Sequence, residues 1–466
     1  MGSVHYPRPA GRMSTRDAGF LYLERPHAPL HIGCVAVLEG HLEVERLARH
    51  IEGRLPRLRR YTQRAVGVPL DAGHPTWEDD PRFEVRRHLQ RWSLPSPGGE
   101  PELAETVGRL LTLPLDRARP LWDMHLVEGL DGGRSAILQR VHHCMVDGMA
   151  GAQLLEALLD EGPRPLVEPR PCGAAPGPLP TAPRRLARAL GAGAGRSARR
   201  GLGVLALLSR PAAARAAVAR LRSAAFAALR LATDDVPDLP WNGPIGAERS
   251  VAFTRLPLAG VRRIRRALGG TLNDVVLSVL AGALHRMLAS VGIDPRGLEV
   301  TALVPVSLRP ADEAASLGNR ISAMLVPLAV DLESEVARLQ ATRAITEGLK
   351  ARSEWVGIDA LLAMLDELPP ALVATAGRRL RLGRVANLIA TNVPGPRETR
   401  WLGGMRVESL RPIVPIVDGI GLGVAIFSYD GWLEIGINAD AASVPDAEKL
   451  QRDIGTAFTA LEATCE

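Results

Sequence analysis

The hydrophobic and polar positions of this 466-residue chain form alternating blocks of strand-like and helix-like pattern. Short apolar runs predict buried strands at 32–38, 135–141, 251–256, 302–309, 321–330 and 386–393. Helical patterns are expected at 12–24, 42–55, from Gly151 onward and at 258–268, and residues 269–274 introduce a long helix that ends at about Ser290. Near the carboxyl end, the glycine-rich stretch 418–423 leads into a hairpin with strands at 424–429 and 432–438. No helix opens after these glycines, so they are not a dinucleotide-binding fingerprint.

Length and composition divide the chain into three parts. A chain of this length is too long for one ordinary domain and predicts two or three. Residues 163–183 are rich in Pro, Gly and Ala and resemble a linker. Residues 184–232 have helical propensity, with expected interruptions at 191–195, 201–203 and Pro211. We therefore predict a first domain at 1–168, a basic linker with helices at 169–240, and a second domain at 241–466.

The positive charge of the chain is concentrated in the linker. Residues 169–233 contain twelve arginines and no Asp, Glu or Lys, and since the whole chain is +6, the rest carries −6. If 212–231 is helical, Arg215, Arg222 and Arg230 fall in one sector, although Phe226 lies among them. Two interpretations stay open, a surface that contacts anionic membrane and a solvated connector. Nucleic-acid binding is disfavoured, because no recognised module accompanies the charge.

Cysteine usage and hydropathy indicate where the protein works. The four cysteines lie far apart in the sequence without metal-like spacing, which fits a reducing cytosol and predicts no metal site. The N-terminus lacks an apolar export segment, and no window of about 18 apolar residues is free of charge. We expect a cytoplasmic protein, soluble or peripheral on the inner face of the plasma membrane or on lipid droplets.

Two adjacent histidines at the end of a predicted strand are the strongest candidates for chemistry. Neighbouring side chains on a strand point to opposite faces, so His142 and His143 do not serve one centre together. We choose His143, nearer the turn, as the residue that faces a cavity and accepts a proton. Asp147 is close enough to fix the local geometry, and Gly148 permits the backbone turn. A nucleophilic Cys144 is disfavoured, because side chains of sequence neighbours diverge.

The pattern His-His-x-x-x-Asp-Gly resembles the acyltransferase superfamily of chloramphenicol acetyltransferase, nonribosomal condensation domains and bacterial wax ester synthase/diacylglycerol acyltransferases. In that superfamily the second histidine is the proposed general base, and the aspartate is mainly structural. The resemblance implies an α/β fold with two chloramphenicol acetyltransferase-like domains. Each has a mixed sheet flanked by helices, and the active-site channel lies between them.

Further motifs resemble the same family and arrive in its order: Ser14-x-x-Asp17-x-x-Phe20, Pro120-Leu121-Trp122, Asn273-Asp274 and Thr391-Asn392-Val-Pro-Gly-Pro. For the Pro-Leu-Trp triplet, core packing and a pocket wall are both open. Thr271 and Asp274 also resemble a capping box, while Asn273 and the helix N-terminus suit an oxyanion or a phosphate of coenzyme A. Thr391 and Asn392 are expected to line the thioester site. Arg309 is a candidate for gripping phosphate or pairing with Asp147.

The resemblance implies an O-acyltransferase that moves a fatty acyl group from acyl-coenzyme A to the hydroxyl of diacylglycerol, of a long-chain alcohol, or of both. Acyl-coenzyme A is then a co-substrate, and no bound cofactor is expected. One alternative is a condensation or polyketide-associated acyltransferase that uses a carrier-protein thioester. The other is a non-catalytic lipid-binding protein of the same fold. Oligomeric state stays open.

Overall fold

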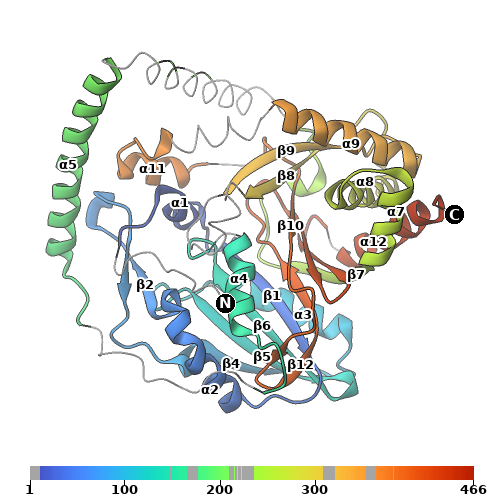
Figure 1. Ribbon diagram of the computed structural model, residues 1–466, viewed down its shortest axis with the longest axis horizontal. Coiled ribbons are helices and arrows are strands. Elements are labelled where there is room, and N and C mark those ends of the chain that lie inside the picture. Colours follow the sequence, from blue (N-terminus) through green and yellow to red (C-terminus); the bar gives the residue numbers. More distant parts are fainter. Residues whose placement is uncertain are drawn as a thin grey trace.

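Two six-stranded mixed sheets form the framework of the molecule (Figure 1). The computed structural model describes residues 11–146, 148–164, 177–208, 215, 218, 222, 236–307, 321–352, 364–380, 383–444 and 446–465. In spatial order, the strands of the first sheet are β11-β12-β1-β6-β5-β4, and those of the second are β7-β14-β13-β10-β8-β9. This is the α/β architecture that the resemblance implied.

The first sheet is built around the histidine-bearing strand. Its strands are β1 (His31–Leu38), β4 (Leu89–Ser93), β5 (Trp122–Leu130), β6 (Arg134–His142), β11 (Trp401–Leu402) and β12 (Met405–Ile413). β6 lies antiparallel between β1 and β5, whereas β4 pairs parallel with β5. Alternate residues of β1 and β6 face two separate cores, one with α2 (Val44–Arg54) and α4 (Gly148–Leu158), the other with α3 (Glu100–Leu111). Burial on both faces holds the register of β6.

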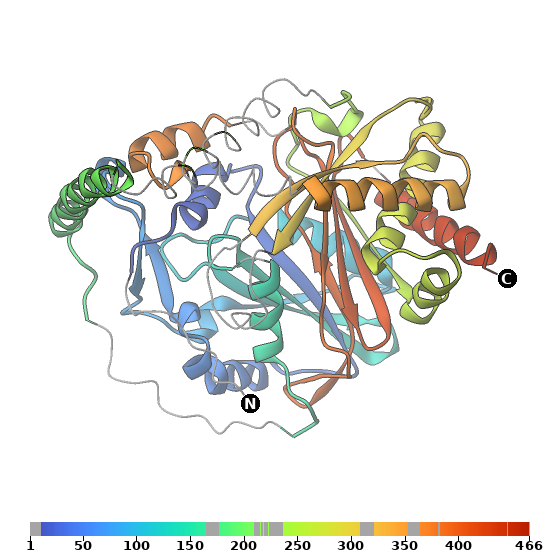
Figure 2. The ribbon, with the colours of Figure 1, turned by 45° about the horizontal axis from the view of Figure 1, so that its top comes forward.

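The second sheet carries its helices on one face. Its strands are β7 (Arg249–Pro257), β8 (Val300–Ser307), β9 (Ile321–Leu328), β10 (Leu388–Val393), β13 (Leu422–Tyr429) and β14 (Trp432–Asp440). The covering helices are α7 (Leu258–Leu268), α8 (Leu272–Ser290), α9 (Glu335–Arg352) and α12 (Ala447–Ala463). Figure 2 shows them together beyond the second sheet, away from the first. The other face is turned toward the first sheet and contacts β12 and α3.

The C-terminal part of the chain contributes two strands to the N-terminal sheet. β12 pairs antiparallel with β1, from Gly33 opposite Ile413 to Leu38 opposite Val407, and β11 pairs with β12. Residues from beyond 400 are thus integral to the first sheet. The boundary expected at 241 separates the sequence into halves, but the first sheet draws on both of them.

Smaller elements complete the described chain. They are α1 (Thr15–Leu23), α11 (Pro370–Gly377) and a two-stranded sheet of β2 (Gln63–Val66) with β3 (Thr76–Asp79). α1 packs against α11, so an N-terminal helix meets a segment from the last quarter of the chain. These contacts, with those of β12, tie the two halves of the sequence together.

One helix is longer than the sequence indicated. α5 (Ala182–Leu208) runs continuously through the glycines at 191–195 and 201–203, where interruptions were expected. That expectation was wrong, since a glycine in a helix costs only about 1 kcal/mol relative to alanine, which flanking Ala, Leu and Arg offset. Figure 1 shows α5 at the edge of the molecule, beside the N-terminal elements.

Among the described residues, one helix is long and apolar enough to cross a membrane by length and composition. This helix is α8, and 72% of its most apolar window is buried inside the molecule. It packs against α12 and α9 in the main core of the second half. These contacts fit a core helix.

Candidate active site

A cavity of about 130 Å³ lies between the two sheets. Its wall is mostly apolar and combines β1, β6 and α4 with β10, β12 and β13. The residues that line it are Ile32, Gly33, Cys34, Gln139, Val141, His143, Gly151, Ala152, Leu155, Pro305, Thr391, Asn392, Val393, Pro412, Ile413, Val414, Ala425, Ile426 and Phe427. Segments from both ends of the sequence therefore line one cavity.

His143 lines this cavity from the turn that follows β6. Its backbone N–H donates a 2.8 Å hydrogen bond to the carbonyl of Leu30, just before β1. Its ring stacks on Phe20 of α1, with the ring centroids 3.9 Å apart and the planes inclined by 8°. Backbone and ring plane are thus both held, which suits a group that must meet a substrate atom in a defined direction.

His142 occupies a different environment from its neighbour. Its side chain is 1% exposed and does not line the cavity. The ring Nδ1 accepts the backbone N–H of Cys144 at 3.0 Å, and Nε2 lies 3.2 Å from Oε1 of Glu24. Strand alternation predicts this separation of the two histidines.

The start of α4 forms one wall close to His143. α4 begins at Gly148, the last residue of the histidine motif, whereas Asp147 lies outside the described residues. A Cβ on Gly151 would come within 2.7 Å of the Ile32 side chain. Absence of a side chain at 151 therefore allows α4 to approach β1 beside the cavity.

Two amides from distant motifs meet near this cavity. Thr391 and Asn392 on β10 both line it. The Asn392 Nδ2 donates a hydrogen bond of 3.4 Å to Oδ1 of Asn273, in the first turn of α8. The Asn-Asp and Thr-Asn-Val-Pro-Gly-Pro motifs, 119 residues apart, thus converge on one wall. Amide and hydroxyl donors here are able to stabilise negative charge on a bound carbonyl oxygen.

Asp274 has a structural task instead of the expected substrate contact. It is 1% exposed, and its Oδ2 accepts the backbone N–H and the hydroxyl of Thr271 at 2.7 and 2.8 Å. Its Oδ1 accepts the hydroxyl of Thr346 at 2.7 Å. Both carboxylate oxygens are occupied by the helix cap and by α9, which opposes the substrate-binding role predicted for Asp274.

The Pro120-Leu121-Trp122 triplet lies behind the cavity wall. All three residues are buried, and none lines the cavity. Trp122 stacks on His88 at 4.3 Å, and its Nε1 donates to the carbonyl of Tyr61 at 2.8 Å. The triplet reaches the cavity only indirectly, because the Tyr61 hydroxyl accepts a hydrogen bond from the cavity-lining Gln139. Of the two open interpretations, core packing describes its position.

The remaining sequence candidates have these outcomes. Arg309 lies outside the described residues. Cys144 is buried, and burial raises the pKa of its thiol well above the usual value, which opposes formation of a thiolate nucleophile. In the described part of the chain, no group of three or more His, Cys, Asp or Glu side chains has an arrangement suited to a metal ion.

The structure adds residues that sequence reasoning did not select. Glu24, Leu30 and Tyr61 support the histidine turn or the cavity wall through contacts that span dozens of residues. Glu24 lies four residues after the motif that ends at Phe20, and a single glutamate at the end of a helix carries no signal of a buried partner. Only the folded chain reveals it.

Comparison with known proteins identifies the family. Residues 13–276 match the family model of the wax ester synthase/diacylglycerol acyltransferase catalytic domain, and residues 317–462 match the C-terminal domain of that family. The chain belongs to the wax ester synthase/diacylglycerol acyltransferase family. A Mycobacterium bovis protein named as a diacylglycerol O-acyltransferase is 35% identical over 458 residues, which cover 97% of this chain and 96% of that protein. The protein is therefore an acyltransferase.

Solved structures support the same fold. The wax ester synthase/diacylglycerol acyltransferase of Marinobacter aquaeolei VT8 matches with a TM-score of 0.65 and 22% identity, covering 97% of this chain and 99% of that one. The starter condensation domain of rhizomide synthetase, solved with C8-CoA and Leu-SNAC, matches with a TM-score of 0.59 and 15% identity over 98% and 94%. The two sheets of this family member thus follow the architecture shared by condensation domains.

Proposed function

We propose that the protein transfers a fatty acyl group from acyl-coenzyme A to the hydroxyl of diacylglycerol or of a long-chain alcohol. The observation that carries this proposal is the position of His143, an imidazole in an apolar cavity between two sheets. An apolar wall suits acyl chains, and a histidine is the side chain best matched to proton transfer near neutral pH. The activity named for the Mycobacterium bovis relative supports the diacylglycerol acceptor.

In the proposed reaction, neutral His143 accepts the hydroxyl proton as the alcohol oxygen attacks the thioester carbonyl. The resulting tetrahedral intermediate collapses with cleavage of the carbon–sulfur bond and expels the coenzyme A thiolate. The imidazolium then returns the proton to that sulfur, so the histidine is regenerated. General base catalysis of this kind typically contributes about 10² to 10⁴ in rate. No covalent acyl-enzyme is required.

The oxyanion of that intermediate needs hydrogen-bond donors. Thr391 and Asn392 are the candidates that line the cavity, and the contact with Asn273 orients the Asn392 amide. Loss of one such donor typically costs about 10² to 10³ in kcat. We assign the oxyanion contact to this wall because it faces the cavity from the sheet opposite His143.

Free acyl-coenzyme A is the proposed donor. The rhizomide synthetase condensation domain, which shares the fold, was solved with C8-CoA, and this supports a coenzyme A thioester as the donor. A carrier-protein thioester is the main alternative, and a non-catalytic lipid-binding role is the other. The family match and the position of His143 both favour an enzyme over a binding protein.

The deciding experiment incubates purified protein with labelled palmitoyl-coenzyme A and a panel of dioleoylglycerol, hexadecanol and hexadecylamine. Thin-layer chromatography should show labelled triacylglycerol or wax ester, with release of free coenzyme A in equal amount. His143→Ala is the control for a contaminating activity. Product formed only from palmitoyl carrier protein would favour the carrier-dependent alternative, and bound lipid without any turnover would favour a binding protein.

A further inference from the structure

The buried carboxylate of Glu24 contacts both His142 and Leu30, which adjoin the backbone of His143. Glu24 follows the last residue of α1, and its side chain is 10% exposed. Its Oε1 lies 3.2 Å from Nε2 of His142 and accepts the backbone N–H of Leu30 at 3.1 Å. Its Oε2 accepts a hydrogen bond of 2.5 Å from Arg117. One carboxylate thus contacts Leu30 nearby in the chain and two residues, Arg117 and His142, that are remote in sequence.

The contacts of His142 define which ring nitrogen carries the proton. Nδ1 accepts the N–H of Cys144, so this nitrogen is unprotonated. In the neutral ring the proton is therefore on Nε2, which lies 3.2 Å from Oε1 of Glu24. The ring spans from the carboxylate to the backbone of the turn that follows β6, and so fixes the position of that turn.

The second path from Glu24 runs through Leu30. The Leu30 N–H is bound by the Glu24 carboxylate, and the Leu30 carbonyl accepts the backbone N–H of His143 at 2.8 Å. Phe20, whose ring stacks on His143, lies one helical turn before Glu24 in α1. Contacts with the C-terminal end of α1 and with Glu24 thus hold both the backbone and the ring plane of His143.

The charge of Glu24 persists at all ordinary pH values. Burial by itself raises the pKa of this carboxyl, but the hydrogen bond and charge of His142, together with Arg117, lower the pKa to about 2. An ionised carboxylate accepts stronger hydrogen bonds than a neutral group. The negative charge beside His142 and the hydrogen bond from Leu30 are therefore constant near neutral pH.

We propose that Glu24 is a positioning residue for His143, acting through His142 and Leu30. Glu24 does not line the cavity, so we assign it a role through its protein neighbours instead of a substrate contact. The inference rests on the proposed function of His143 as the base. A displacement of about 1 Å in a catalytic group costs on the order of 10² in rate, so loss of Glu24 should slow turnover without weakening substrate binding.

Three substitutions at Glu24 separate geometry from charge. Glu24→Ala removes both acceptor contacts, and we expect kcat to fall roughly 30- to 100-fold while KM for palmitoyl-coenzyme A stays within about twofold. Glu24→Gln keeps an oxygen at the right distance, and we expect it to restore kcat to within about fivefold of wild type. Glu24→Asp keeps the charge but is one methylene too short, and it should turn over more slowly than Glu24→Gln.

A matched control is a second buried carboxylate bound by arginine and histidine. Glu128 on β5 pairs with Arg91 and lies 3.4 Å from His41, and its side chain is 11% exposed. It lies six residues along β5 from Trp122, roughly 20 Å by strand rise, at the other end of the strand from His142. Glu128→Ala should lower the thermal midpoint and leave kcat within about twofold.

The measurements are steady-state kinetics with palmitoyl-coenzyme A and hexadecanol, with thermal unfolding of each variant. If Glu24→Ala does not fold, the order of Glu24→Gln and Glu24→Asp decides. Equal kcat for wild type and folded Glu24→Ala, or a faster Asp than Gln variant, would overturn the positioning role. His143→Ala is measured in parallel, and turnover retained in this variant would refute the proposed base. If His143→Ala is inactive but the Glu24 variants have normal turnover, only the positioning role of Glu24 is refuted.

Discussion

Two histidines that are adjacent in sequence have different tasks because the end of a strand separates them. His142 is buried between Glu24 and the backbone of Cys144, whereas His143 lines the cavity against Phe20. A buried ring whose two nitrogens both face protein groups cannot exchange a proton with a substrate. The chemistry is therefore assigned to His143 on geometry that adds to the motif.

At the residue scale, His143→Ala should lower kcat by about 10² to 10⁴ with the fold intact, since the attacking hydroxyl then lacks its proton acceptor. Circular dichroism checks that the fold is intact, and the palmitoyl-coenzyme A assay measures kcat. His50 is the matched control, because it is a buried histidine that does not line the cavity. Its ring hydrogen-bonds the Leu158 carbonyl at 2.6 Å. Near-normal turnover of His143→Ala would refute the assignment.

The Asn392–Asn273 contact gives a second prediction at this scale. Asn392→Ala removes a cavity-lining donor, and kcat should fall about 10² to 10³. Asn273→Ala should act more weakly, through the orientation of Asn392. In the double variant the effects should not add, because both act on one donor. Full additivity would mean that the two amides act separately.

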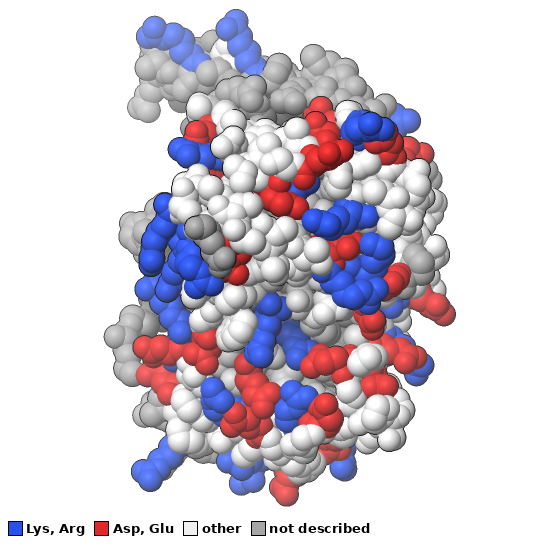
Figure 3. All heavy atoms as spheres, turned by 90° about the vertical axis from the view of Figure 1, so that its right-hand side faces the viewer, with Lys and Arg blue, Asp and Glu red and all other residues white. Residues whose placement is uncertain are grey.

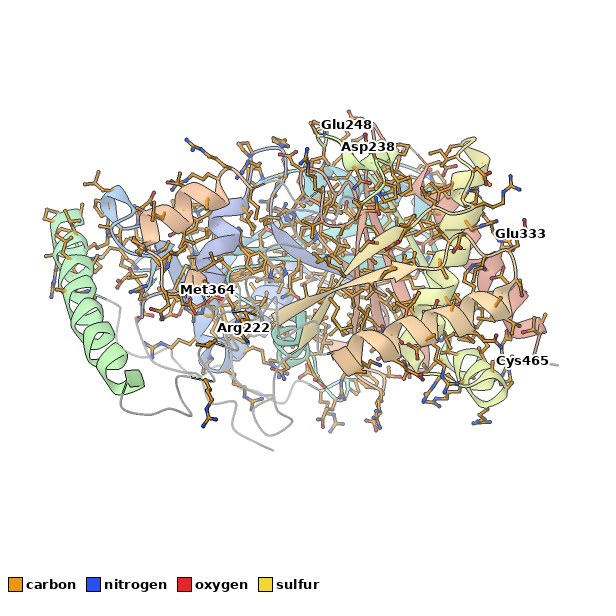
Figure 4. All side chains as sticks on the ribbon, turned by 90° about the horizontal axis from the view of Figure 1, so that it is seen from above. Arg222, Asp238, Glu248, Glu333, Met364 and Cys465 are labelled. Atoms are coloured by element: carbon orange, nitrogen blue, oxygen red, sulfur yellow. The ribbon has the colours of Figure 1, made fainter. Side chains whose placement is uncertain are left out.

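At the scale of the element, α5 is an exposed basic helix at the edge of the molecule. Arg184 and Arg188 are exposed on it, while Ala189 faces Gly73. On the face of the molecule over α7 and α12, basic and acidic side chains are interspersed instead (Figure 3). Glu333 and Cys465 mark that end of the molecule, opposite α5 (Figure 4). The two ends therefore differ in charge pattern.

If α5 contacts anionic membrane, replacing Arg184 and Arg188 by Gln should weaken binding to phosphatidylglycerol vesicles. Each arginine near such a surface contributes about 1 kcal/mol, so the affinity should fall roughly 30-fold, with neutral vesicles unaffected. Arg262→Gln with Arg266→Gln on α7 is the control for loss of two exposed arginines. Vesicle flotation measures both. Equal losses in the two double variants would favour α5 as a solvated connector.

At the scale of the whole molecule, the two halves are joined by β12 and by a buried contact layer. β12 lies in the first sheet and packs on β13 and β14 of the second. A Cβ on Gly436 would clash with the Pro412 carbonyl, so the two strands cross in close contact there. Glu434, two residues before Gly436 on β14, is 2% exposed at this layer. A carboxyl in such a place is costly when ionised.

This layer makes stability depend on pH. Burial raises the pKa of Glu434 from 4.5 to about 7, against the opposing charges of Arg411 and Arg255. The native state then holds a proton that the unfolded state releases, so stability is full below about pH 4.5 and declines as pH rises to about 7. Glu434→Gln should remove this decline, on the order of 3 kcal/mol at most. Urea unfolding at pH 5 and pH 8 measures it.

The exposed Glu248, replaced by Gln, serves as the control for that measurement. It should leave the difference between the two pH values unchanged. A Glu434→Gln variant with the wild-type pH dependence would show that Glu434 titrates normally in the folded protein.

Much of the secondary structure followed from local pattern. α7 was predicted with the observed ends, and α8 within one turn, because an apolar stripe and a Thr-x-x-Asp cap are local signals. β12 was not predicted at all, since Met405–Ile413 has no clean alternation and pairs with β1 near the other end of the chain. The interruptions predicted at the α5 glycines are absent, because neighbouring helix-forming residues outweigh the helix penalty of each glycine.

For the site, sequence alone determined the family, the acyltransferase class and the separate faces of His142 and His143, because a short motif and the period of a strand are properties of neighbouring residues. Tertiary structure decided that Asn273 meets Asn392, that Asp274 binds Thr346, that Trp122 lies behind the wall and that Glu24 supports the histidine turn. The hydrogen bonds among these contacts join residues 61 to 119 positions apart. Only the packing of whole elements brings such groups within hydrogen-bond distance.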